Sequence, residues 1–307
     1  MTAEWWDTDR NGYDADTEYV RSSDLKDFYD CPTIYRARHL LKPGDHGYMG
    51  RKPQSRQMTV GTHIHSAALE GVRDWKTATP CGALKKNGTV CGNDVAAGGM
   101  LCDTEEGIFV CGVHARGRNT VAYPDALTPA ESDSVEGMVT AIENSDVAQE
   151  LLSDRFHERA ARSVDPETGV KKKSLIDIIK PRPFILGDLK STSEFNAESI
   201  WRKIDQNCWL LSLAHYESVV MDIQAAHGKP VHYPAWVFLI VESIPPYRVT
   251  DWPIDGTVQD DARREYRELL AEFSECQRAG VWNQRPINTA APQWWAYKHN
   301  YAHEGSK

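Results

Sequence analysis

The sequence predicts an α/β fold, a central mixed sheet flanked by helices, with a small cysteine-rich segment inserted ahead of the sheet. Strand-like patterns gather between residues 156 and 241, and helical periodicity precedes and follows them. Four of the seven cysteines lie within residues 81–111. We therefore expect an N-terminal arm with the first core helices over 1–76, an insertion over 77–118, and the rest of the same core domain over 119–307.

The composition is that of an ordinary globular protein, with 307 residues, 41% hydrophobic content and a net charge of −9. No stretch approaches the roughly 20 apolar residues of a membrane span, and the N-terminus lacks the order of a signal peptide. We expect a cytoplasmic protein with no membrane partner, and seven cysteines fit a reducing compartment. The negative charge argues against non-specific adhesion to nucleic acid, although the basic runs 171–173 and 202–203 are expected to form a local cationic groove.

Helices are expected on the N-terminal side of the insertion. Ser22 or Ser23 can cap a first helix, Cys31-Pro32 ends it, and a second short helix follows over 33–41. A third helix is expected over 61–75, where apolar residues recur at helical spacing.

Strands dominate the segment after the insertion. Thr128 and Pro129 begin a helix that runs to about residue 153. Strands over 156–164 and 170–179 are separated by a turn sequence, Asp165-Pro-Glu-Thr-Gly169, and should pair as a hairpin. The remaining expected elements are a strand from Phe184 to Lys190, a helix over 197–226, a buried strand over 235–241 and a helix over 260–279.

Two carboxylates and a lysine form the pattern that carries chemistry. Asp177 is followed, after ten residues, by Asp188-Leu189-Lys190. On neighbouring strands the two carboxylates meet at one sheet edge, and a divalent cation removes their repulsion; oxygen donors indicate Mg²⁺ or Mn²⁺. Side chains alternate along a strand, so Lys190 shares a face with Asp188 and can orient a nucleophile or offset developing charge. A solvated cross-strand pair is the other interpretation of Asp-x-Lys.

Several segments together resemble the PD-(D/E)xK nucleases, and among them the phage-type recombination exonucleases similar to exonuclease VIII (RecE-like). The order strand, Asp177, strand, Asp188-x-Lys190, long helix is similar to the core of that superfamily. The matching segments are Ser23-Asp-Leu-Lys-Asp-Phe-Tyr-Asp-Cys-Pro-Thr-Ile-Tyr35, Gly61-Thr-His-Ile-His-Ser-Ala-Ala-Leu-Glu70, Asp177-Ile-Ile179, Gly187-Asp-Leu-Lys-Ser-Thr192, Ala214-His-Tyr216 and Ala235–Val241. The resemblance therefore covers most of the chain.

The resemblance implies a role for each of these residues. Catalytic Mg²⁺ or Mn²⁺ would be bound by His65, Asp177, Asp188 and the backbone oxygen of Leu189, with Lys190 as the catalytic lysine. Without the resemblance, His65 would be a surface or satisfied core histidine. Glu70 is a further candidate for the outer shell of the site.

One position departs from the family pattern. Relatives carry a glutamine four residues before the helix tyrosine, Tyr216, where it helps to hold the DNA end or a water; this chain has Ser212 there. Serine is too short to span the same gap. Gln206 lies six residues earlier, off that face unless the helix is shifted. The departure concerns DNA-end handling rather than metal binding.

The insertion has the pattern of a zinc knuckle formed by Cys81, Cys91, Cys111 and His114. Thiolate and imidazole ligands suit tetrahedral zinc, and four protein ligands make the Zn²⁺ structural. We favour this set over sets that use Cys102, because Cys-x-x-His is the tighter geometric unit. Free buried cysteines and an iron–sulfur cluster are the alternatives.

Basic residues surround the cysteines of the insertion. They are Lys85, Lys86, Arg116 and Arg118. They indicate either a contact with DNA or another subunit, or a solvated surface.

The expected function is a metal-dependent exonuclease that hydrolyses phosphodiester bonds of linear double-stranded DNA. The resemblance further implies 5′ to 3′ digestion from double-stranded DNA ends, 5′ phosphate products, 3′ overhangs, a ring-shaped homo-oligomer and a single-strand annealing protein as partner. It also implies phage-type recombination, in the host cytoplasm if the chain is phage-encoded.

Two other functions stay open at this point. One is a DNA-binding or assembly protein on a catalytically decayed nuclease fold, favoured by Ser212 and the acidic charge but opposed by the intact Asp177, Asp188 and Lys190. The other is an endonuclease of the same superfamily.

Overall fold

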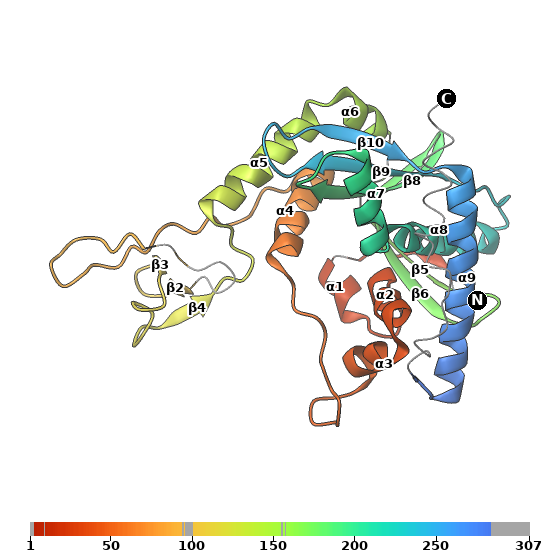
Figure 1. The fold of residues 1–307 in the computed structure, drawn as a ribbon, viewed down its shortest axis with the longest axis horizontal. Coiled ribbons are helices and arrows are strands. Elements are labelled where there is room, and N and C mark those ends of the chain that lie inside the picture. The colour runs from red at the N-terminus through yellow and green to blue at the C-terminus, as the bar shows by residue number, and fades with distance from the viewer. Residues whose placement is uncertain are drawn as a thin grey trace.

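The computed structural model describes residues 3–8, 10–93, 95, 101–154, 156 and 158–283. They form an α/β body and a small module, residues 77–127, that stands away from the body (Figure 1). The last part of the segment expected over 119–307 lies outside the described residues. No helix within the described part of the chain is long and apolar enough to cross a membrane.

The elements follow one another along the chain as helices, then the module, then alternating helices and strands. In order they are β1 Glu4–Trp5, α1 Arg10–Ala15, α2 Ser22–Asp30, α3 Pro32–Tyr35, a π-helical turn Arg36–Leu40, α4 Arg56–Glu70, β2 Leu101–Asp103, β3 Phe109–Val110, β4 Thr120–Ala122, α5 Pro129–Glu143, α6 Asp146–Leu152, β5 Arg159–Val164, β6 Lys171–Ile176, β7 Ile178–Pro181, β8 Phe184–Thr192, α7 Ala197–Gln206, α8 Trp209–Ala226, β9 Ala235–Glu242, β10 Val249–Pro253 and α9 Gly256–Ala279.

The main sheet has the strand order β10-β9-β8-β7 and is mixed. Strands β8 and β9 are parallel, whereas β10 with β9 and β7 with β8 are antiparallel. A second antiparallel sheet has the order β1-β5-β6, and a third, β3-β2-β4, belongs to the module. The prediction of an α/β fold with a mixed sheet flanked by helices is confirmed; β1 and β10 were not anticipated.

Helices cover both faces of the main sheet. On one face Trp236 and Phe238 of β9 belong to a core that includes residues of α2, α8 and α9. On the other face Val237 and Leu239 pack in a core shared with α4 and α5. Because successive side chains of a strand point to opposite faces, a strand buried on both sides is apolar throughout, as 235–241 is.

Two predicted elements are each divided in the structure. The prediction of one helix over 197–226 is wrong, because the chain leaves the helix at Asn207 and Cys208 has a left-handed φ of 48°. The Asn207 amide donates to the Lys203 carbonyl oxygen at 2.9 Å, a local bond that competes with continuation of the helix. The strand predicted over 170–179 is two strands, since β6 pairs with β5 and β7 pairs with β8.

The helix expected over 61–75 is shifted towards the N-terminus. It begins at Arg56, where the Ser55 hydroxyl accepts a hydrogen bond from the Met58 N–H. It ends at Glu70 because Gly71 takes a left-handed φ of 73°. The helix expected from Thr128 to about residue 153 is likewise two helices, α5 and α6, because Ser145 caps the second.

Candidate metal centres

Asp177 lies where the chain passes from the second sheet to the main sheet, beside strand β8. Its Oδ2 accepts a hydrogen bond from the Leu189 N–H at 3.0 Å and lies 3.3 Å from His65 Nδ1. His65 projects from α4, and its Nε2 lies 3.0 Å from the Leu189 carbonyl oxygen. Burial lowers the pKa of His65, but the adjacent Asp177 carboxylate outweighs burial and raises it. Segments far apart in the sequence thus meet at one point.

Glu158 joins this group from the residue before β5. One nitrogen of His65 and one carboxylate oxygen each of Glu158 and Asp177 lie within 4.8 Å of one another. Burial and then the charge of Asp177 raise the pKa of Glu158 to about 7, and its carboxyl is hydrogen-bonded to Glu70. Glu158 is not among the residues predicted for the site, because no sequence motif marks it. The only signal was its place beside a strand expected to pair with the one that leads to Asp177.

Asp188 is the most deeply buried carboxyl of the centre, with 1% of its surface exposed. Its Oδ1 accepts a hydrogen bond from Lys190 Nζ, as the alternation along the strand predicted, whereas its Oδ2 has no partner within the described residues. Burial raises the pKa of Asp188, Lys190 opposes this and Asp177 adds to it, and the result is about 7. Two adjacent buried carboxyls, one with an unpartnered oxygen, fit a divalent cation with oxygen ligands.

The pKa of Asp177 is shifted in the opposite direction. Burial would raise it, but the charge of His65 and a hydrogen bond from it hold the pKa far below its usual value. Asp177 is therefore the ionised member of the pair, and Asp188 is the member whose charge depends on a nearby cation.

A second lysine faces the centre from α2. Lys26 interacts electrostatically with Lys190 and Asp188; burial, followed by the charge of Lys190, lowers the pKa of Lys26 to about 8. No ion pair or hydrogen bond between described residues involves its side chain. Lys26 was not predicted as a site residue, because it is far from Lys190 in the sequence and no pattern shows that the two lie close in space.

The remaining residues expected at the site take different positions. Tyr216 on α8 is near the carboxylates: burial, then the charges of Asp188 and Asp177, raise its pKa well above the usual value, and its hydroxyl is hydrogen-bonded to Ser22. Ser212, one turn earlier, is buried. Gln206 is exposed at the end of α7, whereas Ser212 belongs to α8. The prediction treated both residues as parts of one helix and compared their positions around it, and it is therefore wrong.

The cationic groove expected from the basic runs is not formed by them. Lys172 is fully buried and pairs with Asp165 at 2.8 Å and Asp222 at 2.9 Å. Lys173 is also buried and donates to two backbone carbonyl oxygens of the N-terminal arm. The exposed members of the runs are paired as well, Lys171 with Glu18 and Arg202 with Glu198. Four members of the runs are therefore engaged within the fold. Half-buried Lys203 has no ion pair or side-chain hydrogen bond among the described residues.

The module brings together Cys81, Cys91, Cys111 and His114. Each offers one ligand atom, and the four atoms lie within 4.8 Å of one another. His114 Nδ1 is 3.5 Å from Cys81 Sγ and 3.3 Å from Cys111 Sγ. Cys102 on β2 is not in the group, and its thiol donates to the Asp103 carbonyl oxygen instead. The structure thus assembles the set favoured from the sequence.

Short backbone connections hold the cysteine ligands in place. The Cys91 N–H donates to the Ala83 carbonyl oxygen, and the Gly92 N–H donates to the Cys81 carbonyl oxygen, so Cys81 and Cys91 close the base of a hairpin. Hydrogen bonds from the His114 backbone and side chain lower the pKa of Cys111 to about 6 against burial. Three sulfur donors and one nitrogen suit tetrahedral zinc, and they leave no ligand position for a substrate.

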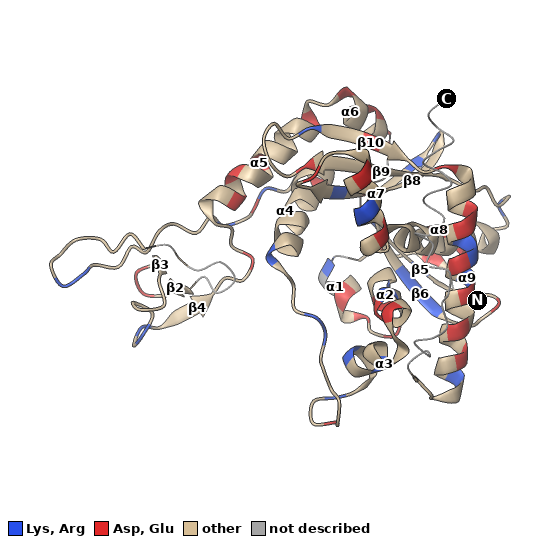
Figure 2. Cartoon of the chain, viewed as in Figure 1, with Lys and Arg blue, Asp and Glu red and all other residues tan. Residues whose placement is uncertain are grey.

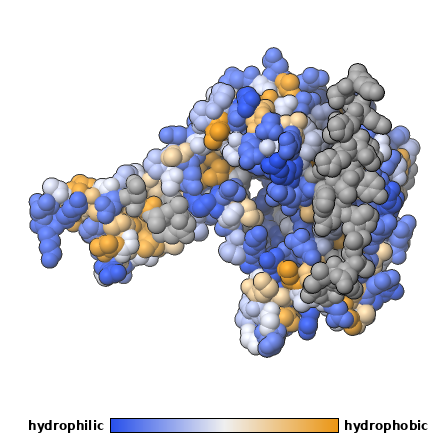
Figure 3. All heavy atoms as spheres, in the orientation of Figure 1, coloured by the Kyte–Doolittle hydropathy of each residue, from blue (hydrophilic) through white to orange (hydrophobic). Residues whose placement is uncertain are grey.

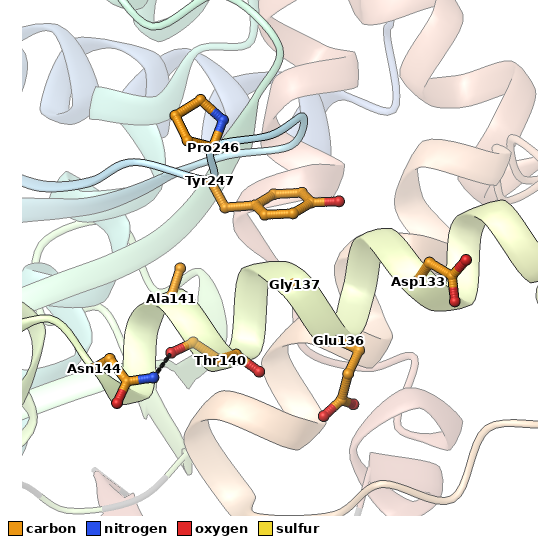
Figure 4. Close-up of a pocket in the computed structure, with 8 residues that line it drawn as sticks. All are labelled: Asp133, Glu136, Gly137, Thr140, Ala141, Asn144, Pro246 and Tyr247. Carbon is orange, nitrogen blue, oxygen red and sulfur yellow. Dashed lines mark hydrogen bonds between the residues drawn. The ribbon is translucent and has the colours of Figure 1, made fainter.

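A shallow hollow of about 460 Å³ lies away from both centres, between α5 and the turn from β9 to β10 (Figure 4). The ring of Tyr247 lies over Gly137, where an added Cβ would come within 2.3 Å of the ring. The Asn144 amide donates to the Thr140 carbonyl oxygen at 2.8 Å (Figure 4). No residue of either metal centre lines this hollow, and its contacts fix α5 against the sheet.

Comparisons with known proteins support the fold. No protein-family model matches the sequence, and no curated protein matches it. Among solved structures, a protein from Eubacterium rectale described as a "putative exonuclease" is similar, with a TM-score of 0.53 and 13% sequence identity. The similarity covers 96% of this chain and 94% of that one. The two proteins share a fold over nearly their whole length.

Proposed function

We propose that this chain is a metal-dependent DNA exonuclease of the PD-(D/E)xK superfamily, with Asp177, Asp188 and Lys190 as its catalytic residues. One observation carries the proposal. The buried Asp188 has one oxygen paired with Lys190 and the other without a hydrogen-bond partner among the described residues, and it interacts with Asp177, which in turn lies 3.3 Å from His65. The shared fold with a protein described as a "putative exonuclease" supports it.

The centre suits Mg²⁺ or Mn²⁺ as the catalytic ion. We propose that His65, Asp177, Asp188 and the Leu189 carbonyl oxygen hold it, and we add Glu158 to this set. When bound, the ion lowers the pKa of a water molecule and offsets negative charge on a phosphodiester. His65 must be neutral to act as a ligand, so protons compete with the cation for it.

The chain's own side chains supply the remaining chemistry. Asp188 accepts a hydrogen bond from Lys190 and thereby fixes its ammonium at the site, where it can donate to a phosphate oxygen or orient the nucleophile. Lys26 adds a second positive charge that has no ion pair or side-chain hydrogen bond among the described residues, and we propose that it contacts a neighbouring phosphate. Tyr216 stays protonated, because its pKa is raised, and can donate a hydrogen bond.

We propose the finer properties on the basis of the family resemblance. They are 5′ to 3′ digestion of linear double-stranded DNA, 3′ overhangs for phage-type recombination, a ring-shaped homo-oligomer and a single-strand annealing partner. Ser212, in place of a glutamine, bears on how the DNA end is held, and Gln206 and Glu70 remain candidates for that region. The insertion predicted over 77–118, which forms most of the module, is proposed to bind structural Zn²⁺ through Cys81, Cys91, Cys111 and His114, between core segments 1–76 and 119–307.

The activity is tested with three substrates: 5′-labelled linear duplex, internally labelled linear duplex and closed-circular DNA, each with Mg²⁺ or with chelator. We expect hydrolysis of the linear substrates only, dependence on Mg²⁺, and no hydrolysis by Asp188→Asn. Asp251→Asn, which alters an exposed aspartate on β10, should keep full activity. Nicking of the circles would establish an endonuclease. Binding of DNA without cleavage in Mg²⁺ and Mn²⁺ would establish a binding protein.

A further inference from the structure

The hairpin between Cys81 and Cys91 presents two lysines at its tip. The Lys85 N–H donates to the Thr89 carbonyl oxygen at 2.8 Å, and the Gly88 N–H donates to the Lys85 carbonyl oxygen at 2.9 Å. Gly88 has a φ of 79°, a left-handed conformation that other residues rarely adopt. The turn is closed by its own hydrogen bonds, while the cysteines hold its base, so Lys85 and Lys86 are displayed on a short, well-defined support.

The two lysines of the hairpin have no ionic partner in the part of the chain that the structure describes. No ion pair or hydrogen bond between described residues involves the side chains of Lys85, Lys86 or Arg116, whereas Arg118 pairs with Asp103 and Glu106. Figure 2 shows Lys and Arg at the outer end of the module, while acidic residues are frequent along α5 and α9 of the body. In a chain with a net charge of −9, unpaired cations on a projecting tip complement an anion outside the chain.

Apolar side chains accompany these cations. Leu84 and Val90 face each other across the hairpin and are 63% and 58% exposed. They take no part in the small core of the module, which is built around the cysteines. Exposed aliphatic groups beside free lysines fit the edge of a nucleic acid backbone, where sugars alternate with phosphates.

The base of the module is fixed to the helix that carries His65. Arg56 of α4 donates to the carbonyl oxygens of Pro124 at 3.0 Å and Ala126 at 2.9 Å, and His63 Nε2 lies 2.8 Å from the Asp125 carbonyl oxygen. Figure 3 shows this face of the molecule hollowed between α4 and α7, and the module stands on the α4 side of that hollow. One helix therefore sets both a ligand of the carboxylate centre and the direction of the hairpin.

We propose that this hairpin is a second DNA-binding site, in which Lys85 and Lys86 contact phosphates of the duplex whose end lies at the carboxylate centre. The identity of the ligand rests on the proposed function. The contact is electrostatic and independent of sequence, so it adds affinity and holds the duplex in line without taking part in the reaction.

Binding is measured by fluorescence anisotropy with Ca²⁺ in place of Mg²⁺, on duplexes of about one and about four helical turns. The test variant is Lys85→Ala/Lys86→Ala. Its matched control is Lys229→Ala/Arg278→Ala, which removes two exposed charges from the body. We expect the test variant to bind the long duplex about tenfold more weakly, with a salt dependence of log K reduced by up to about 1.8, and the short duplex as the wild type does. The control should match the wild type on both.

Two further measurements keep the outcomes distinct. Zinc content equal to that of the wild type establishes that the variant module is intact. Hydrolysis of the short duplex in Mg²⁺ reports on the carboxylate centre: if no form of the protein cleaves it while the lysines still add affinity, the proposed activity fails and the second site stands. Wild-type affinity and salt dependence in the test variant would overturn the inference. An altered oligomeric state by ultracentrifugation, with unchanged DNA affinity, would also overturn it and assign the hairpin to a contact between copies.

Discussion

The two candidate metal centres differ in how the chain assembles them. The cysteine centre takes all its ligands from 81–114, within one small module held by turns. The carboxylate centre takes His65 from α4, Glu158 from the start of β5, and Asp177 from the crossing between two sheets. A site made of neighbouring turns depends on local spacing, whereas a site made of distant elements depends on the fold that brings them together.

Their surroundings differ as well. Three thiols and an imidazole form a closed set, which suits an ion that only stabilises structure. The carboxylate centre has a carboxylate oxygen without a hydrogen-bond partner in the described part of the chain, and two lysines lie nearby, so it offers a ligand atom for a hard cation and positive charge for an anionic substrate. We therefore expect changes at one centre to leave the other intact.

The largest effect is expected from Cys91→Ser. Structural zinc contributes on the order of 10 kcal/mol to small zinc domains, so loss of one ligand should release the metal and open the module. Metal analysis should show loss of zinc and limited proteolysis should cut within 77–127, while hydrolysis of a short duplex changes less than about threefold. Cys102→Ser is the control and should retain zinc, since Cys102 lies outside the cluster. Loss of zinc from Cys102→Ser, together with retention of zinc by Cys91→Ser, would contradict the proposed set of zinc ligands.

A smaller effect is expected from Glu158→Gln, which neutralises a carboxylate of the second centre. Initial rates of hydrolysis of linear duplex should fall by about 10²- to 10³-fold, because a negative charge close to Asp177 and His65 is lost. Glu70→Gln should reduce the rate by about tenfold or less, since Glu70 is hydrogen-bonded to Glu158 and is not part of the ligand cluster found among the described residues. Zinc content should be unchanged in both. Equal losses in the two variants would remove Glu158 from the proposed ligands.

A third prediction concerns His215, whose hydrogen bonds join distant segments of the body and make the free energy of unfolding depend on pH. Its Nε2 donates to the Lys173 carbonyl oxygen at 2.9 Å, and its Nδ1 accepts from the Tyr266 hydroxyl at 3.1 Å, which requires the neutral ring. Burial lowers the pKa of His215 from 6.5 to about 4. In this range the unfolded chain binds a proton that the folded chain does not, so stability is complete above 6.5 and is lost as the pH falls towards 4.

Urea unfolding measures that loss. The free energy of unfolding of the wild type should fall by about 2 kcal/mol through this group between about pH 7 and about pH 5. His215→Gln cannot take up the proton and should show a smaller fall over the same interval, whatever its stability at pH 7. Identical pH dependence in the two proteins would show that His215 is not held neutral.

The smallest effect is expected at two helical glycines of the body. A methyl group at Gly137 would clash with the Tyr247 ring, whereas one at Gly61 meets nothing within 4 Å. The clash costs about 1–3 kcal/mol, and the gain in helix propensity offsets about 1 kcal/mol of it. Gly137→Ala should therefore lower the free energy of unfolding by about 1 kcal/mol, and Gly61→Ala should raise it by about 0.5–1 kcal/mol. Stabilisation by both would show that Tyr247 moves away freely.

The sequence anticipated much of the fold where local rules apply. Thr128 and Pro129 begin α5, and the Asp165–Gly169 turn joins β5 and β6, because capping and turn residues act on their own neighbours. It failed at 197–226 and at 170–179, where the apolar pattern continues across a break. Apolar periodicity shows which face of an element is buried, but it does not show where the element ends. The elements before and after each break are both buried in the body, so the pattern runs on across the break.

The sequence alone determined the cysteine cluster, the pairing of Asp188 with Lys190 along one strand, and the apolar strand 235–241, since each depends on spacing within a single element or turn. Only the tertiary structure decided that Glu158 and Lys26 lie at the carboxylate centre and that Lys172 and Lys173 do not form its basic surface. The reason is physical: a charged side chain is equally compatible with solvent, an ion pair or a site until the fold places its neighbours.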